Sequence, residues 1–156
     1  AVYFADFGTL GTVTEVLGEI TVLSGTPDWF QYDLKGNSSL ETSINSSREA
    51  GTTFYTQTLN LTLPVLDKAT QEEIKILAVT RPHIAVEDYN GSFFLLGLQH
   101  GCDLTGGTIV SGAGMADLSG FTLTMEANEI APAQFVIASV ITAQASAVKI
   151  DPTAAC

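Results

Sequence analysis

Residues 53–63 read TFYTQTLNLTL, and their alternation decides the class of fold. In an extended chain successive side chains point to opposite faces. One face then carries Tyr55, Gln57, Leu59, Leu61 and Leu63, and the other carries Thr56, Thr58, Asn60 and Thr62. This period of two is typical of an antiparallel strand with one buried face. It predicts a strand over residues 53–63.

Other segments repeat this pattern. The segment FTLTMEA, residues 121–127, alternates in the same way and predicts a second strand. In AVEDYNGSFFLLGL, residues 85–98, the pair Asn90-Gly91 predicts a hairpin with a type I′ turn. We also expect a strand, or a hairpin broken at Gly18, over residues 11–25 and a short strand over 28–34. Because threonine, valine, isoleucine and glycine are plentiful, the protein is predicted to be mainly β.

One helix is indicated between these strands, over about residues 68–80. Asp67 and Thr70 are both candidate N-caps, the latter in capping-box spacing with Glu73. An apolar stripe follows, and Pro82 ends the helix. The stripe consists of Ile74, Leu77 and Ala78.

Two segments carry less regular patterns. Residues 35–53, KGNSSLETSINSSREAGTT, are polar and almost without apolar anchors, which predicts a long loop. Residues 130–148 carry no charge, but Pro132 and several polar side chains interrupt them, so we expect a buried strand or strand pair and no membrane span. With 156 residues, the chain is predicted to be a single domain, residues 1–156, and its two cysteines, Cys102 and Cys156, to be free thiols.

The charge balance excludes several functions. Seventeen acidic residues against six basic ones give a formal net charge of -11, and the basic residues are scattered. Binding to DNA, RNA or an anionic membrane requires clustered lysine and arginine. We therefore expect neither nucleic-acid affinity nor a membrane partner.

The stretch HGCDLTGGTIVSGAGMADLSG, residues 100–120, suggests chemistry by its composition. His100, Cys102 and Asp103 resemble metal ligands, but the only other histidine is His83 and their clustering is local. His100 and Cys102 also lie too close in sequence to form the oriented pair of a cysteine hydrolase. We interpret the stretch as a connection with short strand character at residues 108–110, in which bulky replacements at Gly106 or Gly107 impair folding or assembly.

Three other candidate sites are weaker. GAGMAD, residues 112–117, lacks the third glycine of a dinucleotide fingerprint and precedes a strand where that motif opens a helix. Glu72 with Glu73, and Glu87 with Asp88, favour solvated positions over carboxylate pairs. We accordingly predict no enzyme and no catalytic, cofactor-binding or metal-binding residues.

Four segments together resemble a family of proteins. They are AGTTFYTQTLNLTLPVLD (50–67), EEIKILA (72–78), VEDYNGSFFLLGLQHGCDLTGGT (86–108) and ADLSGFTLTMEANEIAPAQFV (116–136). In overall pattern the chain looks like a small virion structural protein of tailed bacteriophages, and most like a major tail tube protein. The resemblance covers roughly residues 50–136, and none of the four segments is a catalytic motif.

The resemblance implies both a fold and a function. The fold is an antiparallel β-sandwich or barrel-like core with one side-packed α-helix. The function is that of a structural subunit that forms stacked rings, usually hexameric, and so builds the tail tube through which DNA passes. Its partners would be its own copies and other virion tail or head proteins, with DNA as a non-adhering cargo, and its location would be the virion, assembled in the cytoplasm of the bacterial host.

Two alternatives stay open. A head-to-tail joining or capsid-decoration protein of the virion would use the same kind of acidic β domain. A bacterial surface or carbohydrate-binding β domain is the alternative from another class. It would need an exposed aromatic platform, for which Trp29, Phe30 and Tyr32 are the clustered candidates, although a core or interface strand is the favoured interpretation.

Overall fold

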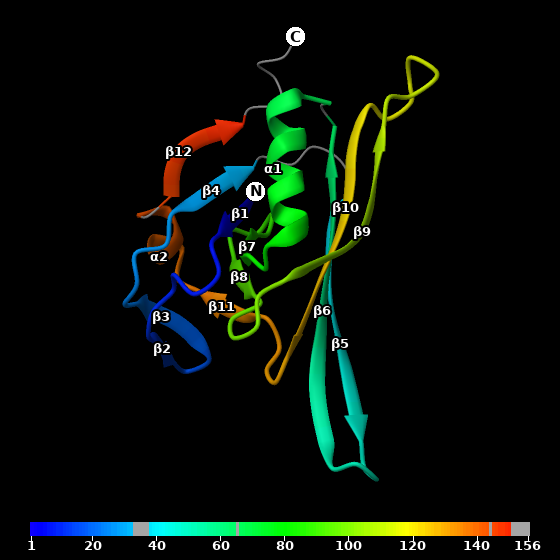
Figure 1. Cartoon of the computed structure of the whole chain (residues 1–156). Helices are drawn as coiled ribbons and strands as arrows, with labels where there is room; N and C mark the ends of the chain where they lie inside the picture. Colours follow the sequence, from blue (N-terminus) through cyan, green and yellow to red (C-terminus); the bar gives the residue numbers. More distant parts are fainter. Residues whose placement is uncertain (33–37, 65, 144, 151–156) are drawn as a thin grey trace.

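The computed structural model describes residues 1–32, 38–64, 66–143 and, for the backbone alone, 145–150. Twelve strands and two helices follow one another along these residues (Figure 1). The first half of the chain holds β1 Val2–Ala5, β2 Val13–Val16, β3 Glu19–Leu23, β4 Trp29–Tyr32, β5 Ser39–Ser47, β6 Thr52–Leu63 and α1 Lys68–Val79. The second half holds β7 His83–Glu87, β8 Phe93–Leu96, β9 Asp103–Val110, β10 Gly120–Glu129, β11 Gln134–Val136, α2 Ala138–Thr142 and β12 Ala145–Ile150.

The strands form two sheets. The eight-stranded sheet has the order β12-β4-β1-β7-β8-β11-β3-β2, and the four-stranded sheet has the order β5-β6-β10-β9. All neighbours in the four-stranded sheet are antiparallel. Its long strands extend beyond the rest of the molecule in Figure 1, with the β5–β6 hairpin at the bottom and the β9–β10 loop at the top. The protein is therefore mainly β, as the sequence pattern predicts, and sandwich-like, as the resemblance implies, with α1 at the predicted place.

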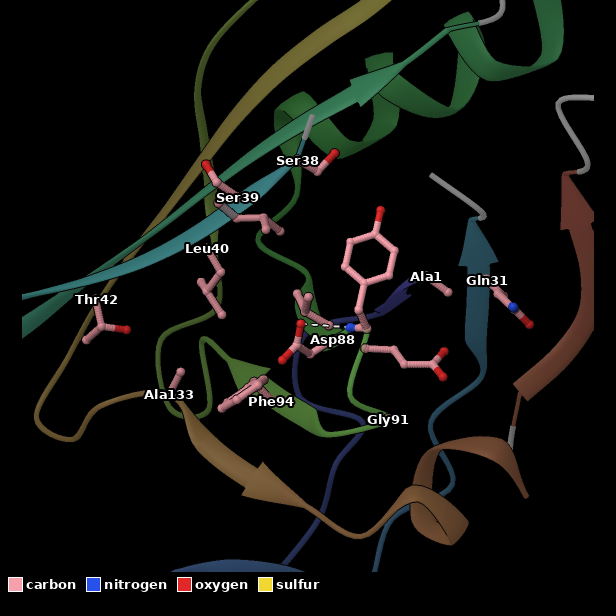
Figure 2. Close-up of a pocket in the computed structure, with 14 residues that line it drawn as sticks. Ala1, Gln31, Ser38, Ser39, Leu40, Thr42, Asp88, Gly91, Phe94 and Ala133 are labelled. Atoms are coloured by element: carbon pink, nitrogen blue, oxygen red, sulfur yellow. Dashed lines mark hydrogen bonds between the residues drawn. The ribbon is translucent and has the colours of Figure 1, made fainter. Parts of the chain in front are cut away.

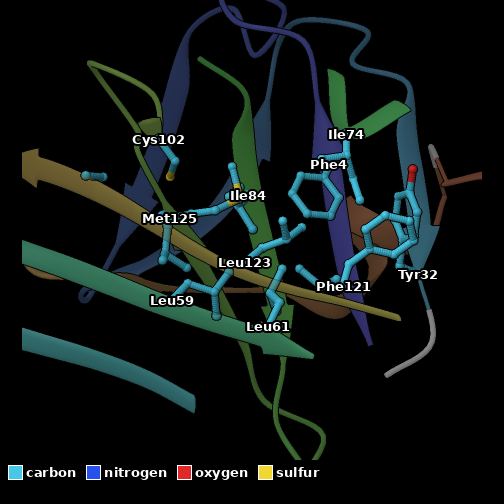
Figure 3. Close-up of a cluster of buried hydrophobic side chains, with 13 residues drawn as sticks. Phe4, Tyr32, Leu59, Leu61, Ile74, Ile84, Cys102, Phe121, Leu123 and Met125 are labelled. Atoms are coloured by element: carbon cyan, nitrogen blue, oxygen red, sulfur yellow. The ribbon is translucent and has the colours of Figure 1, made fainter. Parts of the chain in front are cut away.

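The main core lies between the two sheets. Alternate residues of β6 and β10 supply one side of it, and β1, β4, β7 and β8 supply the other, while Ile74 of α1 closes part of its margin (Figure 3). The fully buried side chains include Leu59, Leu61, Ile84 and Phe121. A second apolar cluster, with Trp29 and Ile20 at its centre, covers the opposite face of the eight-stranded sheet and includes Ile141 of α2. The central strands of the eight-stranded sheet, of which β1 is buried along its whole length, thus have apolar clusters on both faces.

The predicted loop over residues 35–53 is wrong for most of its length. Residues 39–47 form the edge strand β5, which pairs with β6 from Ser39↔Asn60 to Ser47↔Thr52. Apart from Leu40 and Ile44, the side chains of β5 are polar. One face of this strand is exposed to solvent and its far end extends past the core, so few of its side chains need to be apolar. The sequence therefore shows no apolar alternation there. Residues 35–37 and Cys156 lie outside the described residues.

The predicted type I′ turn at Asn90-Gly91 is also wrong, although the hairpin itself forms between β7 and β8. Asp88 N donates to Ser92 O and Gly91 N donates to Asp88 O, and only Gly91 of the turn has a positive φ, of 80°. This is a type I turn closed by a left-handed glycine. The two-residue turn with two positive φ angles lies instead at Leu17 and Gly18, between β2 and β3.

Two further segments differ from expectation. Residues 130–148 hold β11, the short helix α2 and β12 in place of a strand or strand pair. The strand β9, expected only at residues 108–110, begins at Asp103. The register against β10 shifts at Thr105, which marks a β-bulge there. This bulge and the two glycines after it, Gly106 and Gly107, interrupt the alternation of polar and apolar residues, so the sequence pattern does not predict the first part of β9.

Candidate assembly surface

The outer face of the four-stranded sheet is polar and ordered. The side chains of β6 and β10 on this face are threonines, asparagines, one glutamate and, toward the hairpin end, the exposed Phe54. Asn45 Nδ2 donates to Thr56 Oγ1 at 2.9 Å, and Thr56 Oγ1 donates to Asn128 Oδ1 at 2.8 Å. Thr124 Oγ1 donates to Asn60 Oδ1 at 3.0 Å. These bonds cross three strands and hold the polar side chains in a fixed array.

A row of carboxylates crosses this outer face. The strand register places Glu41 opposite Thr58, Thr58 opposite Glu126, and Glu126 opposite Asp103. All three carboxylates therefore share one face and one line across the sheet. The four strands contain no lysine or arginine. Like charges directly opposite each other destabilise a sheet, so the Glu126–Asp103 pair does not serve the stability of a single chain.

Both edges of the four-stranded sheet are open. Among the described residues, β5 pairs only with β6 and β9 pairs only with β10. Natural edge strands commonly carry lysine or proline to prevent pairing with other chains. Neither β5 nor β9 contains either residue, and the one irregularity in these two strands is the bulge at Thr105 of β9. The two edges therefore offer backbone N–H and C=O groups to further strands.

The β5–β6 hairpin projects beyond its sheet. The last pair between β10 and β6 is Glu129↔Tyr55, so β10 does not support residues 45–54. Phe54 is exposed on this two-stranded extension, Ile44 is exposed at its base, and Arg48 lies in its turn. An isolated two-stranded hairpin is marginally stable in water. A neighbouring molecule that covered it would bury its apolar side chains.

The opposite end of the sheet carries the β9–β10 loop, residues 111–119. The Asp117 carboxylate accepts hydrogen bonds from Ala113 N at 3.0 Å and Gly114 N at 2.7 Å, which orders the turn. Met115 is fully exposed at its tip. The GAGMAD motif thus lies in a loop between two strands and does not open a helix, as the sequence predicts.

A groove of about 800 Å³ opens beside β5, where the two sheets diverge. Figure 2 shows Ser39, Leu40 and Thr42 on one side of it and Ala1 and Gln31 on the other. Its apolar lining comes from both sheets, and its charged lining residues are all acidic. The apolar residues include Leu40, Leu59, Val86 and Phe94, and the acidic ones are Glu87 and Asp88.

The suspected chemical cluster at residues 100–103 does not converge. Cys102 is buried in the main core, where burial raises the pKa of its thiol. His100 is largely exposed and its Nδ1 lies 3.0 Å from Glu129 Oε2, while Asp103 lies on the outer face of the sheet. No group of metal-ligating side chains occurs among the residues that the structure describes. The buried Glu129, 29 residues from His100, could not be found from sequence spacing.

Glu129 has a structural role. Its Oε1 accepts hydrogen bonds from Gln99 N at 3.1 Å and from His100 N at 2.8 Å. It therefore ties the loop after β8 to the end of β10. Gln57, the polar residue on the buried face of β6, acts in the same way by accepting a bond from Gly97 N at 3.2 Å.

His83 is likewise a structural residue. It is buried, Gly8 N donates to its Nε2 at 3.1 Å, and its Nδ1 donates to Gly97 O at 2.6 Å. Because Nε2 accepts a hydrogen bond, the imidazole is neutral. Burial lowers its pKa, against the raising effects of Gly97 and the Glu129 charge. The imidazole fastens the loop after β1 to the loop after β8.

The carboxylates of Glu72 and Glu73 have different partners. Glu72 is exposed and pairs with Lys75 at 3.3 Å, whereas Glu73 accepts a hydrogen bond from the Tyr32 hydroxyl. Burial, followed by the Glu73 hydrogen bond and charge, raises the pKa of Tyr32. Asp88 accepts a hydrogen bond from Tyr89 N and so stabilises the β7–β8 turn.

The clustered aromatic residues of β4 do not form a platform. Trp29 is fully buried on one face of the eight-stranded sheet, and Tyr32 is buried in the main core on the other. Phe30 alone is partly exposed, beside α1. The favoured interpretation of this segment as a core strand is therefore confirmed.

Neither helix in the described part of the chain is long and apolar enough to cross a membrane. No protein-family model matches the chain, and no curated protein or solved structure shows significant similarity to it.

Proposed function

We propose that the chain is a structural subunit of a tailed-phage virion that assembles into stacked rings and forms the tail tube through which DNA passes. One observation carries the proposal. A four-stranded sheet with two open edges presents an ordered, acidic face that contains no lysine or arginine. The resemblance of residues 50–136 to tail tube proteins agrees with it.

Ring closure follows from the two edges. If β5 of one copy pairs with β9 of the next, every edge of the four-stranded sheets in the ring finds a partner, as in a closed barrel. The contact is head to tail, because each copy contributes a different edge. Copies can be added through this contact until the ring closes and no free edge remains. The family resemblance implies a ring of six copies.

In this ring the outer faces of the four-stranded sheets become the wall of the channel. The row of Glu41, Glu126 and Asp103 then continues from copy to copy around the lumen. Phosphate groups of DNA are repelled by carboxylates and find no cation to bind. DNA therefore passes along the wall as a cargo that does not adhere.

The β5–β6 hairpin supports stacking of the rings. Its extension beyond β10 leaves Ile44 and Phe54 exposed at one end of the sheet, and the Met115 loop lies at the other end. A second ring placed on the first would cover these side chains. Other virion proteins would bind the exposed surfaces of the first and last rings of the stack.

Negative-stain electron microscopy and sedimentation velocity of the purified 156-residue chain test the proposal. We expect tubes of constant width, and a variant in which Asn-Gly replaces residues 46–53 and serine replaces Ile44 and Phe54 should give rings that no longer stack. Asn45 and Phe54 face each other in the register, so a two-residue turn can join them. Isolated rings or decorated shells from the wild-type chain would favour a joining or decoration protein, and a stable monomer that binds glycans would favour the carbohydrate-binding alternative.

A further inference from the structure

The exposed side of α1 is the part of the molecule where cations and apolar side chains meet. Of the six basic residues, four have described side chains, and three of these lie on α1 or directly after it. Lys68, Lys75, Ile76 and Val79 are all exposed and lie on the side of the helix away from the buried Ile74. Glu72 lies on the same side and pairs with Lys75 at 3.3 Å, so this side carries two lysines and one glutamate. Both exposed apolar residues remain uncovered in a single copy.

The groove beside β5 has the complementary character. Its lining includes apolar side chains of both sheets, and its charged lining residues are Glu87 and Asp88. Among the described residues, no lysine or arginine lines it. Tyr89, at the tip of the β7–β8 turn, is fully exposed at its rim. An apolar groove with an acidic rim fits a helix that carries exposed apolar side chains beside lysines.

The two surfaces lie beside opposite edges of the same sheet. The groove opens next to β5, whereas the chain that leaves α1 is fixed to the start of β9 by a hydrogen bond from Cys102 N to Pro82 O at 2.9 Å. When β5 of one copy meets β9 of the next, α1 of that next copy approaches the groove. We propose that α1 of the adjacent copy, through Ile76, Val79 and its lysines, fills the groove beside β5. This inference rests on the proposed function, because it names the second contact of the same head-to-tail ring.

Disulfide cross-linking tests the inference in a Cys156→Ser background, where the remaining Cys102 is buried. One protein carries Tyr89→Cys at the groove and the other carries Val79→Cys on α1, both at exposed positions. We expect oxidation of assembled mixtures to give a cross-linked dimer, and each protein assembled alone to give none. Leu17→Cys, also fully exposed but on the β2–β3 turn, replaces Tyr89→Cys as the matched control and should not cross-link to Val79→Cys.

The outcomes separate this contact from the assembly itself. Assembled rings that give no Tyr89–Val79 cross-link would overturn the groove contact and leave the ring proposal standing. Cross-linking by either protein alone, or equal cross-linking by the Leu17 control, would also overturn it. A wild-type chain that does not assemble would overturn both proposals.

A second variant measures the energetic weight of the contact. Val79→Asp places a charge on the exposed helix face and should raise the concentration needed for assembly by about tenfold or more, with no change in the unfolding temperature of the monomer. Leu17→Asp is the control and should leave assembly unchanged. Equal effects of the two substitutions would contradict the inference.

Discussion

Adding one methyl group at Gly107, by the substitution Gly107→Ala, should disturb the packing of β9 against β10. A Cβ atom built there collides with the carbonyl oxygen of Thr122 and lies 3.3 Å from Leu123 Cα, so the backbone of β9 or β10 must move. Overpacking of this kind costs about 1–3 kcal/mol. For a chain of this length, a loss of about 2 kcal/mol lowers the unfolding temperature by about 4–8 °C.

Gly106 is the matched control, because a Cβ atom there meets nothing within 4 Å. Gly106→Ala should be neutral or should stabilise the protein by about 0.4–1 kcal/mol, since alanine restricts the unfolded chain. For the folding of one copy, the open space at Gly106 thus confines to Gly107 the sequence-based expectation that bulky replacements at either glycine impair folding or assembly. Urea unfolding followed by circular dichroism measures both variants. Equal free energies of unfolding for Gly107→Ala and Gly106→Ala would refute the reasoning.

Three further predictions concern other parts of the molecule. Cys102→Ser should lower the free energy of unfolding by about 1–3 kcal/mol, because a hydroxyl is buried, yet leave assembly intact in electron micrographs. Folding lowers the pKa of His83 below its ordinary value of 6.5, so the stability that neutral His83 contributes is complete above pH 6.5 and is lost as the pH falls below 6.5. Chemical unfolding of the wild type and of His83→Gln between pH 7.5 and 5 should therefore show that the free energy of unfolding depends less on pH in the variant. Glu126→Lys should relieve repulsion from Asp103 without loss of stability and should make assembled protein retain DNA in cosedimentation at low salt.

The sequence correctly predicts the strands that have one face exposed to solvent and the other buried in the core, because their polar and apolar residues alternate regularly. Strands β6 and β10 pair along nine consecutive positions, and each buries every second residue, so their pattern is strong. Strand β5 escapes prediction because it is an edge strand whose inner face passes beyond the core after Leu40. A polar strand with solvent on both sides has the composition of a loop.

The candidate surface was predictable only in part. The acidic charge and the lack of basic residues are properties of the sequence, but the line formed by Glu41, Glu126 and Asp103 depends on the register of three strand pairs. The groove depends on the divergence of two sheets and leaves no mark in local sequence. Conversely, His100, Cys102 and Asp103 are neighbours in sequence, yet a turn and the start of a strand send their side chains to different environments.

The line of carboxylates also bears on when assembly can begin. Each copy added to a ring brings three negative groups toward those already present, so closure works against a repulsion that a free copy does not feel. Dissolved salt weakens that repulsion over a distance of about 8–10 Å. The critical concentration for polymerisation should therefore fall as ionic strength rises. At low ionic strength, the same repulsion should prevent copies from forming the first ring unless a preformed ring is present as a template.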